Sequence, residues 1–398
     1  MKIKTQKIEE LLTRGVDEVI NRQHLEKRLK SGEKLRVKFG IDPTGSELHL
    51  GHSVPFRKLR QFQNLGHKVI FLIGDYTATI GDPSGRSEAR KPLAEKQIKN
   101  NMKSYINQAG KILNIKKVEI RYNSEWYKKK GALFLLDLTS RFTIARVMER
   151  DDFKKRMKED VDISVLEILY PLMQGYDSVE LKADVEIGGR DQKFNFLMGR
   201  KVQKRYEQSK QDIIMVPLLE GTDGVRKMSK SYNNYIGLTE DSLKMYGKIM
   251  SIPDGVMWKY FRLLTNISVK EIKDMQNKVF PLGILSPKDV KARLAREIVT
   301  MYHSKKEAEK AEKEFNRVFK EKRLPTKIPE IKINRKKIDI LDLLVKTELV
   351  SSKSDAKRLI LQGGVKINKK VQEDWKAVVE IKKGLIVQVG KRRFAKIN

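Results

Sequence analysis

The fold is decided by the stretch Leu35-Arg36-Val37-Lys38-Phe39-Gly40-Ile41-Asp42-Pro43-Thr44, which leads into His49-Leu50-Gly51-His52. The apolar run at 35–41 predicts a short buried strand, and the turn after it leads to the start of a helix. Comparable runs at 69–74, 117–122 and 213–219 are separated by longer helical patterns. Strands that alternate with helices favour a parallel sheet covered on both faces, so an α/β fold is predicted.

The composition limits the functions that the chain could have. It has 398 residues, a formal net charge of +33 and no cysteine. The charge indicates either a polyanionic partner or a generally lysine-rich surface, and it does not decide between them. The lack of cysteine excludes disulfides, Cys-ligated zinc and a thiol nucleophile. Neither a signal-peptide core nor an apolar run of about 20 residues is present, so a cytoplasmic protein without membrane contact is expected.

The length predicts several domains. We expect an α/β domain over 1–225 and a helical domain with its preceding loop over 226–321. Residues 320–337 carry eight basic residues, two acidic residues and two prolines, which predicts a basic linker at 322–337. The segment 338–398 then forms a small independent α+β domain.

Two short motifs predict a nucleotide site. His49 and His52 stand three residues apart at a predicted helix start, where backbone N–H groups attract phosphate oxygens. Protonatable or N–H-donating imidazoles would add to that field, and Gly51 would let a nucleotide lie against the backbone. Much later, Lys227-Met228-Ser229-Lys230-Ser231 offers mobile charges for a departing pyrophosphate. Taken separately, the first motif could be a capped surface helix and the second a chance pair of lysines.

Two further loops add polar groups. The turn at 80–85 is followed by Arg86 and Arg90, whose guanidinium groups suit phosphate, although it could be an ordinary surface turn. Gly188-Gly189-Arg190-Asp191-Gln192 combines glycines, which allow close backbone approach, with an aspartate able to accept ribose hydroxyls.

A polar stripe marks a second pocket. Tyr170, Gln174 and Asp177 fall at i, i+4 and i+7 on an otherwise apolar helix that begins near Ile163. Burying a phenol, an amide and a carboxylate in line requires partners. Either a polar ligand or an internal hydrogen-bond network could supply them.

Together these motifs resemble the bacterial tyrosyl-tRNA synthetases, which are class I aminoacyl-tRNA synthetases. The resemblance rests on Tyr-x-x-x-Gln-x-x-Asp at 170–177 and Gly-Gly-x-Asp-Gln at 188–192, and it extends over 35–238. It implies a Rossmann-like catalytic domain. Tryptophanyl enzymes share the fold, but their helix typically reads Ala-Ala-Asp and their loop Gly-Glu-Asp-Gln, so tyrosine is favoured.

The resemblance also implies roles for the site residues. Tyrosine would be bound by Gly40, Asp82, Tyr170, Gln174, Asp177 and Gln192, with Asp177 accepting the phenolic hydrogen. ATP would meet Asp42, Gly51, Gly189, Asp191, Met228 and Ser229. Catalytic contacts would come from Thr44, His49, His52, Arg86, Lys227 and Lys230, with Arg90 also near the pyrophosphate. Mg²⁺ would be carried with ATP, and no metal ligated by the protein is expected.

One position departs from the family. Many members have a tyrosine four residues before the aspartate of Asp-Pro-Thr, and here that position is Lys38. Asp177 would then carry more of the hydroxyl recognition, or another group would replace the missing phenol.

The last segment adds a basic helix. Residues 351–368 read as a helix that starts on serine and stops on glycine, followed by a short strand. This segment resembles the S4 RNA-binding domain, which would place tRNA(Tyr) against Lys353, Lys357, Arg358 and Lys366, although a solvated helix face is the alternative.

The resemblance therefore implies the activity of a tyrosine–tRNA ligase, and it also implies a homodimer formed through helices near 134–156. A noncatalytic RNA-binding protein and another nucleotidyl transferase are the competing hypotheses. Tyrosine-dependent ATP–pyrophosphate exchange would distinguish the ligase from the noncatalytic protein, and a substrate screen would distinguish it from the other nucleotidyl transferase.

Overall fold

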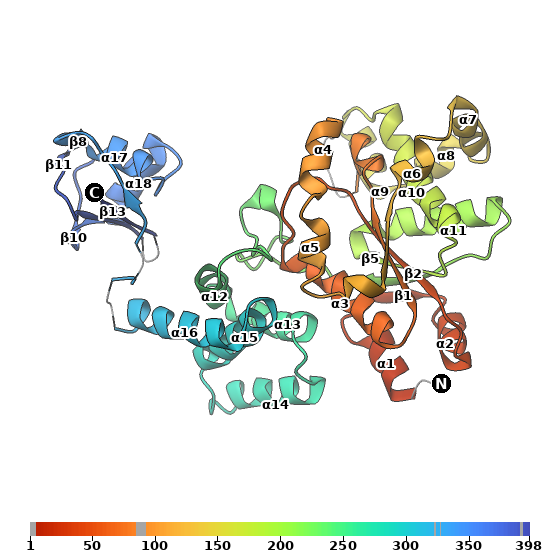
Figure 1. The fold of residues 1–398 in the computed structure, drawn as a ribbon, viewed down its shortest axis with the longest axis horizontal. Helices are drawn as coiled ribbons and strands as arrows, with labels where there is room; N and C mark the ends of the chain where they lie inside the picture. The colour runs from red at the N-terminus through yellow and green to blue at the C-terminus, as the bar shows by residue number, and fades with distance from the viewer. Residues whose placement is uncertain (1–4, 85–92, 322–323, 327, 391–392) are drawn as a thin grey trace. The chain divides into compact units, whose positions relative to one another are not determined.

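The computed structural model describes residues 5–84, 93–321, 324–326, 328–390 and 393–398. The chain divides into two compact units, Met1–Glu309 and Lys310–Asn398. The first unit contains a parallel sheet with helices on both faces, followed by a group of helices (Figure 1). The domain boundary expected at 225/226 falls inside this first unit.

The central sheet has six strands in the order β1-β6-β5-β2-β3-β4. All neighbours are parallel except β1, which pairs antiparallel with β6 at one edge. The four strands expected from apolar runs are confirmed as β2, β3, β4 and β6, whereas β1 and β5 were not predicted. The strands are β1 Glu18–Ile20, β2 Arg36–Ile41, β3 Lys68–Ile73, β4 Val118–Tyr122, β5 Val185–Gly189 and β6 Asp212–Val216.

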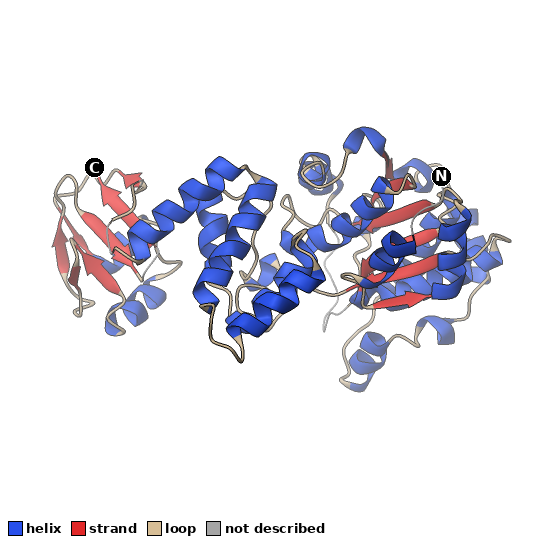
Figure 2. Ribbon diagram, turned by 90° about the horizontal axis from the view of Figure 1, so that it is seen from below, coloured by secondary structure: helices blue, strands red, loops and turns tan. Residues whose placement is uncertain are grey.

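Both faces of the sheet are covered at β3, where every residue after Lys68 is apolar and buried. On one face, Phe56 of α3 (Leu50–Asn64) packs edge-on against Phe39 and Phe71, each with ring centroids 5.2 Å apart. On the other face, Ile70 and Leu72 belong to the same apolar cluster as residues of α10 (Val165–Glu180). Figure 2 shows the strands between these helical layers.

The remaining helices of the α/β part connect the strands or lie beside them. They are α1 Thr5–Thr13, α2 Arg22–Ser31, α4 Glu95–Met102, α5 Tyr105–Ala109, α6 Ser124–Tyr127, α7 Ala132–Ser140, α8 Ile144–Val147, α9 Asp151–Lys158 and α11 Lys193–Arg205. Helices α10 and α11 pack closely against each other, and Gly175 and Gly199 face each other at this contact.

The pattern from 239 onward is helical, as the sequence predicts. The helices are α12 Ser242–Met250, α13 Asp254–Leu264, α14 Val269–Val279, α15 Pro287–Tyr302 and α16 Lys305–Phe319. This group is joined to the α/β part by two arginines, since Arg14 and Arg57 each donate to the Thr265 carbonyl at 2.7 Å. Helices α12 to α15 belong to the first compact unit, whereas α16 extends past its last residue, Glu309.

The second unit is a small α+β domain with helices α17 (Ile340–Lys346) and α18 (Lys353–Leu361). Its sheets have the orders β10-β9-β12-β13-β7 and β11-β8. Within the segment 322–337, which is expected to be a linker, Glu330 and Ile331 form β7 and pair parallel with β13. The strands are β7 Glu330–Ile331, β8 Lys337–Asp339, β9 Val365–Ile367, β10 Lys370–Val371, β11 Val378–Glu380, β12 Ile386–Val389 and β13 Arg393–Ile397.

A search of the described residues finds no helix that is both long enough and apolar enough to cross a membrane.

Candidate active site

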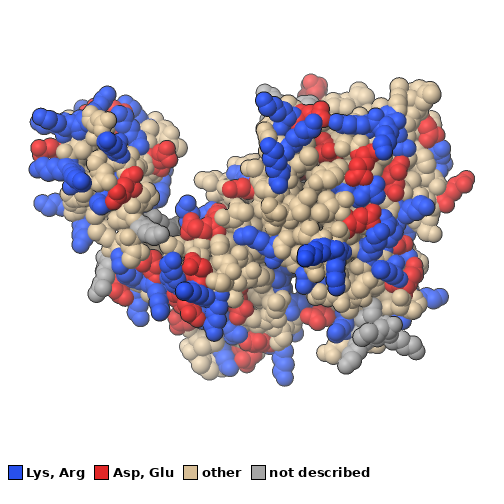
Figure 3. Space-filling model, viewed as in Figure 1, with Lys and Arg blue, Asp and Glu red and all other residues tan. Residues whose placement is uncertain are grey.

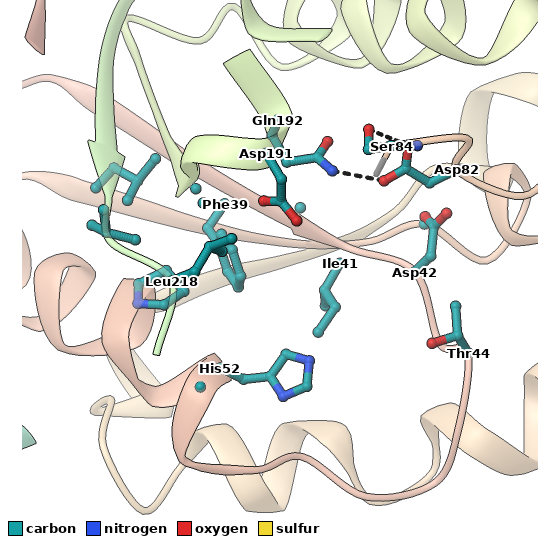
Figure 4. A pocket seen from close by; sticks show the side chains of 18 of the residues that line it. Phe39, Ile41, Asp42, Thr44, His52, Asp82, Ser84, Asp191, Gln192 and Leu218 are labelled. Atoms are coloured by element: carbon teal, nitrogen blue, oxygen red, sulfur yellow. Dashed lines mark hydrogen bonds between the residues drawn. The ribbon is translucent and has the colours of Figure 1, made fainter. Parts of the chain in front are cut away.

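A cavity of about 670 Å³ lies at the carboxyl ends of β2, β5 and β6. Polar side chains from separate segments point into it (Figure 4). Arg86, with Arg90, lies outside the described residues. Every other residue predicted to bind tyrosine or ATP, or to act in catalysis, lines this one cavity: Gly40, Asp42, Thr44, His49, Gly51, His52, Asp82, Tyr170, Gln174, Asp177, Gly189, Asp191, Gln192, Lys227, Met228, Ser229 and Lys230.

The first histidine motif begins helix α3. His49 is the residue just before the helix, and its ring centroid lies 3.9 Å from that of His52. The backbone N–H of His49 donates to Nδ1 of His52 at 3.2 Å. Burial lowers the pKa of His52 to about 4, and burial also lowers the pKa of His49 well below its ordinary value. Both imidazoles are therefore neutral at pH 7 and can serve as N–H donors rather than as cations.

The lysine motif closes over the same end of the cavity. Lys230 Nζ donates to the Glu47 carbonyl at 2.8 Å, beside the turn that precedes the histidines. The approach is so close that a Cβ on Gly45 would lie 2.4 Å from Lys230 Nζ. Lys227 Nζ is 3.1 Å from an Asp191 oxygen, which ties the motif to the loop after β5. Two segments about 175 residues apart therefore meet at one site.

A chain of hydrogen bonds connects Asp42, which follows β2, with Asp177 on α10. Tyr170 donates from its hydroxyl to Asp42 Oδ2 at 2.9 Å, and Thr77 Oγ1 donates to Asp42 Oδ1 at 2.8 Å. Asn123 Nδ2 lies 2.9 Å from Thr77 Oγ1 and 3.3 Å from Asp177 Oδ2. Burial, with the nearby Asp42 charge, raises the pKa of Tyr170 well above its ordinary value, so its hydroxyl remains a donor.

Asp82 belongs to a second polar network. Its Oδ2 accepts from Gln192 Nε2 at 2.7 Å, and its Oδ1 accepts from both the backbone N–H and the hydroxyl of Ser84 (Figure 4). Buried Arg150 donates to Ser84 Oγ at 3.0 Å and holds this turn from behind. The carboxylate is thereby fixed at the cavity wall with its charge available to a cationic ligand group.

Asp177 lines the cavity and is only 2% exposed. Trp126 Nε1 donates to its Oδ1 at 3.1 Å, and Asn123 donates to its Oδ2. Burial raises the pKa of Asp177 to about 7, against the opposing influence of Lys38 and these donors. A carboxylate held in this way can still accept a hydrogen bond from a hydroxyl that enters the cavity.

Lys38, where a tyrosine is common in the family, forms a buried ion pair. Its Nζ is 2.8 Å from Glu186 Oε1, and the two side chains are 1% and 2% exposed. The residues are direct neighbours across the β2–β5 ladder. Glu186 was not predicted from the sequence, because the strand that carries it, β5, was not predicted either.

Some polar groups of the cavity have no protein partner. Gln174 Oε1 and His49 Nδ1 are buried and accept or donate no hydrogen bond among the described residues. Unsatisfied buried polar atoms are costly, so a polar ligand is a natural partner for them. The polar residues of α10 could be satisfied either by an internal hydrogen-bond network or by a polar ligand. The internal network satisfies Tyr170 and Asp177, whereas the side-chain oxygen of Gln174 is left for a ligand.

Thr77, Asn123 and Trp126 were not assigned as site residues from the sequence. The signal for Thr77 and Asn123 was their position just beyond β3 and β4, where ligand groups gather in parallel sheets. Trp126 had no such signal, because its contact with Asp177 depends on the way α6 turns back over the sheet.

The basic residues predicted to bind RNA lie on or next to α18 in the second unit. The helix begins after Ser352, whose hydroxyl accepts from the Asp355 N–H, and a left-handed Gly363 follows its end, as predicted. Lys353 Nζ is 2.6 Å from Asp342, and Arg358 pairs with Asp355. Lys357 lies over the Trp375 ring at 3.9 Å from its centroid. Lys366 is on β9.

Comparisons with known proteins give the family of the chain. The family model described as "tRNA synthetases class I (W and Y)" matches residues 30–320. A second, described as "Tyrosine--tRNA ligase SYY-like C-terminal domain", matches residues 320–397.

The chain is 50% identical to the tyrosine–tRNA ligase of Idiomarina loihiensis, covering 97% of this chain and 96% of that protein. It is 49% identical to that of Carboxydothermus hydrogenoformans, covering 98% and 97%. The crystal structure of a C-terminally truncated mitochondrial tyrosyl-tRNA synthetase of Aspergillus nidulans is similar, with a TM-score of 0.66, 25% identity, and coverage of 79% of this chain and 94% of that one. The chain therefore belongs to the class I tRNA synthetases, in the tyrosine–tRNA ligase family.

Proposed function

We propose that the protein joins L-tyrosine to tRNA(Tyr) in two steps. The tyrosine carboxylate attacks the α-phosphorus of ATP, and the bond to the β-phosphate breaks, which gives tyrosyl-adenylate and pyrophosphate. A ribose hydroxyl of the terminal adenosine of the tRNA then attacks the tyrosyl carbonyl, and AMP leaves. Mg²⁺ would arrive with ATP as part of the nucleotide substrate.

The polar end of the cavity suits the amino acid. The phenol would enter toward Asp177, a buried carboxylate in the cavity wall. The ammonium would meet Asp82, Gln192, Tyr170 and the open acceptor of Gln174. These groups face each other across one cavity, so a single tyrosine could contact both sets.

The open end suits the nucleotide. Thr44, Asp42, Gly51, Gly189 and Asp191 would contact ATP between the first histidine motif and the lysine motif. Gly51 is required there because a Cβ would lie 2.9 Å from His49 Nδ1 and crowd the ring. Met228 and Ser229, on the closing loop, would complete this part of the site.

Catalysis would come from position and charge rather than from a covalent intermediate. The neutral imidazoles of His49 and His52 would donate N–H groups to the phosphates, and Lys227 and Lys230 would stabilise the departing pyrophosphate. Such contacts strengthen as charge moves onto the leaving group, so they act mainly in the transition state. Arg86 is proposed for the same role on the strength of the family resemblance.

The observation that carries the proposal is the meeting of the histidine motif, the lysine motif and Asp177 in one cavity. The test is ATP–pyrophosphate exchange with each of the twenty amino acids, followed by the same assay on Asp177→Ala. Exchange with tyrosine alone, lost in the variant, is expected. Exchange with a different amino acid, or with none, would contradict the proposal, and the second outcome would favour a noncatalytic RNA-binding protein.

The second unit is proposed to bind the tRNA. Over this unit Figure 3 shows more Lys and Arg than Asp and Glu side chains. Lys357 and Lys366 have no ion pair with a carboxylate among the described contacts, whereas Lys353 and Arg358 are each already paired within the unit. Substitution of Lys357 and Lys366 by Gln should weaken tRNA binding and reduce its salt dependence, while leaving ATP–pyrophosphate exchange unchanged.

The protein is proposed to be a cytoplasmic homodimer. The segment 133–166, which includes the helices expected at the dimer interface, exposes large apolar side chains such as Leu133 (82% exposed), Ile144 (67%) and Val165 (75%). Apolar side chains gathered in this way mark interaction surfaces. Light scattering should give the mass of two chains, and Leu133→Glu combined with Ile144→Glu should give the mass of one.

A further inference from the structure

The ion pair between Lys38 and Glu186 lies beneath the cavity in the core of the protein. Both side chains are almost fully buried, and both residues contribute to the cavity wall. A buried pair of this kind is weak evidence for stability, because desolvation offsets most of the attraction. The position of the pair next to the pocket that selects the amino acid points to a functional reason for it.

The three donors of the Lys38 ammonium are all taken by protein acceptors. Besides Glu186, Nζ donates to Ser178 Oγ at 2.7 Å and to the Gln174 carbonyl at 3.4 Å. These two acceptors lie on α10, on either side of Asp177. The ammonium therefore ties strand β2 to the helical turn that carries both Gln174 and Asp177. It has no free hydrogen with which to replace the phenol that many relatives carry at this position.

Charge is the second consequence of this position. Burial raises the pKa of Asp177, and Lys38 is the strongest influence in the opposite direction. The titratable groups that face Asp177 are Lys38 from β2, Tyr127 from α6, and Tyr170 from its own helix, with Glu186 on β5 behind the lysine. Among these, only Lys38 is a cation.

We propose that Lys38 is a positioning residue for tyrosine selection: it fixes the turn of α10 that bears Gln174 and Asp177, and it keeps the Asp177 carboxylate ionised to accept the phenolic hydrogen. Glu186 limits the influence of the Lys38 charge on Asp177, because the Glu186 carboxylate pairs with the same ammonium group. The inference rests on the proposed function, since it concerns how that site distinguishes tyrosine from phenylalanine.

The test uses three variants in the full-length protein. Lys38→Met removes the cation but leaves Glu186 buried without its partner, so Lys38→Met/Glu186→Gln is the variant that keeps a neutral pair of similar shape. Glu186→Gln alone leaves the ammonium without its carboxylate. Lys58→Met is the matched control, because Lys58 is also a buried lysine (3% exposed), and its hydrogen bonds among the described residues go to the main-chain carbonyls of Leu11 and Arg14 and not to the cavity lining.

The readouts are kcat/KM for tyrosine and for phenylalanine in pyrophosphate exchange, measured across pH, and the KM for ATP. In the double variant the acid limb of kcat/KM for tyrosine should move up by about 1–3 pH units, as expected when a neighbouring opposite charge is removed. At pH 7 the preference for tyrosine over phenylalanine should then fall about tenfold or more, with partial recovery at pH 9. Glu186→Gln should move the same limb down, and Lys58→Met should not move it.

A merely structural role predicts a different pattern. The double variant would then lose activity with tyrosine and phenylalanine equally, with an unmoved pH profile, and that result would overturn the inference. If the unmodified protein shows no tyrosine-dependent exchange, the proposed function itself fails. The inference would then be judged by the pH dependence of unfolding, where Lys38→Met/Glu186→Gln should raise the pKa of Asp177 and an unchanged value would refute it.

Discussion

Replacing Asp177 by Asn should make the protein more stable and less active. The carboxylate is buried, and its pKa is raised from 3.8 to about 7. A shift of about three units corresponds to about 4 kcal/mol of unfavourable free energy in the ionised folded state. The neutral amide of Asn avoids this penalty. It also loses one acceptor, so the donor of Asn123 is left unsatisfied at a cost of about 1–3 kcal/mol.

The net expectation is that Asp177→Asn raises the free energy of unfolding at pH 8 by about 1–3 kcal/mol. The sign follows from linkage: a carboxyl whose folded pKa is raised favours folding below its unfolded pKa, and this contribution is lost as pH rises through about 7. The advantage of the variant should therefore shrink by about 2–3 kcal/mol between pH 8 and pH 5. Urea unfolding at both pH values measures it.

The same substitution should reduce kcat/KM for tyrosine far more than for phenylalanine. Sites built to bond a hydroxyl, of which tyrosyl-tRNA synthetase is the standard example, reject the analogue that lacks it by about 10⁴–10⁵-fold. That magnitude belongs to the family and is not calculated from this structure. An Asp177→Asn protein whose stability relative to the unmodified protein is the same at pH 5 and pH 8 would refute the reasoning about the buried charge.

Three further predictions concern other parts of the molecule. Lys230→Ala should lower kcat for pyrophosphate exchange by about 10²–10³-fold with little change in tyrosine affinity, because its charge acts on the leaving group, and an unchanged kcat with weaker tyrosine binding would contradict this. Gly51→Ala should lower kcat without unfolding the protein, since the added Cβ would displace the His49 ring, and kinetics paired with thermal melting distinguish the two effects. Phe56→Ala should lower the free energy of unfolding, measured in urea, by about 3–5 kcal/mol, because the fully buried ring packs against Phe39 and Phe71. A decrease below about 1 kcal/mol would show that neighbouring side chains move in to fill the space left by the ring.

The strands that the sequence predicted are those with unbroken apolar runs. β5 was missed because its five residues include Glu186 and two glycines, so neither periodicity nor composition marks it as a strand. β1 was missed because its three residues follow a helix closely and gain their strand character from pairing with β6. The strand at Glu330 and Ile331 was missed for the same reason, since its pairing partner lies at the far end of the chain.

The site was predictable where chemistry follows a motif. The residues of the two nucleotide motifs and of the α10 stripe could be named because each motif places them at a fixed spacing. Their partners could not be named, because Thr77 and Glu186 reach the cavity, and Trp126 reaches Asp177, through tertiary packing between segments with no spacing rule between them. The neutral state of the histidines was also beyond the sequence, because it results from burial.

The central claim is that two distant segments enclose one nucleotide beside a carboxylate that receives the phenol. A crystal structure with a non-hydrolysable tyrosyl-adenylate analogue tests this most directly. We expect the phenolic hydroxyl within hydrogen-bond distance of Asp177 and the phosphate between His49 and Lys230. An analogue bound with its phenol away from Asp177, or with Lys230 remote from the phosphate, would contradict the account.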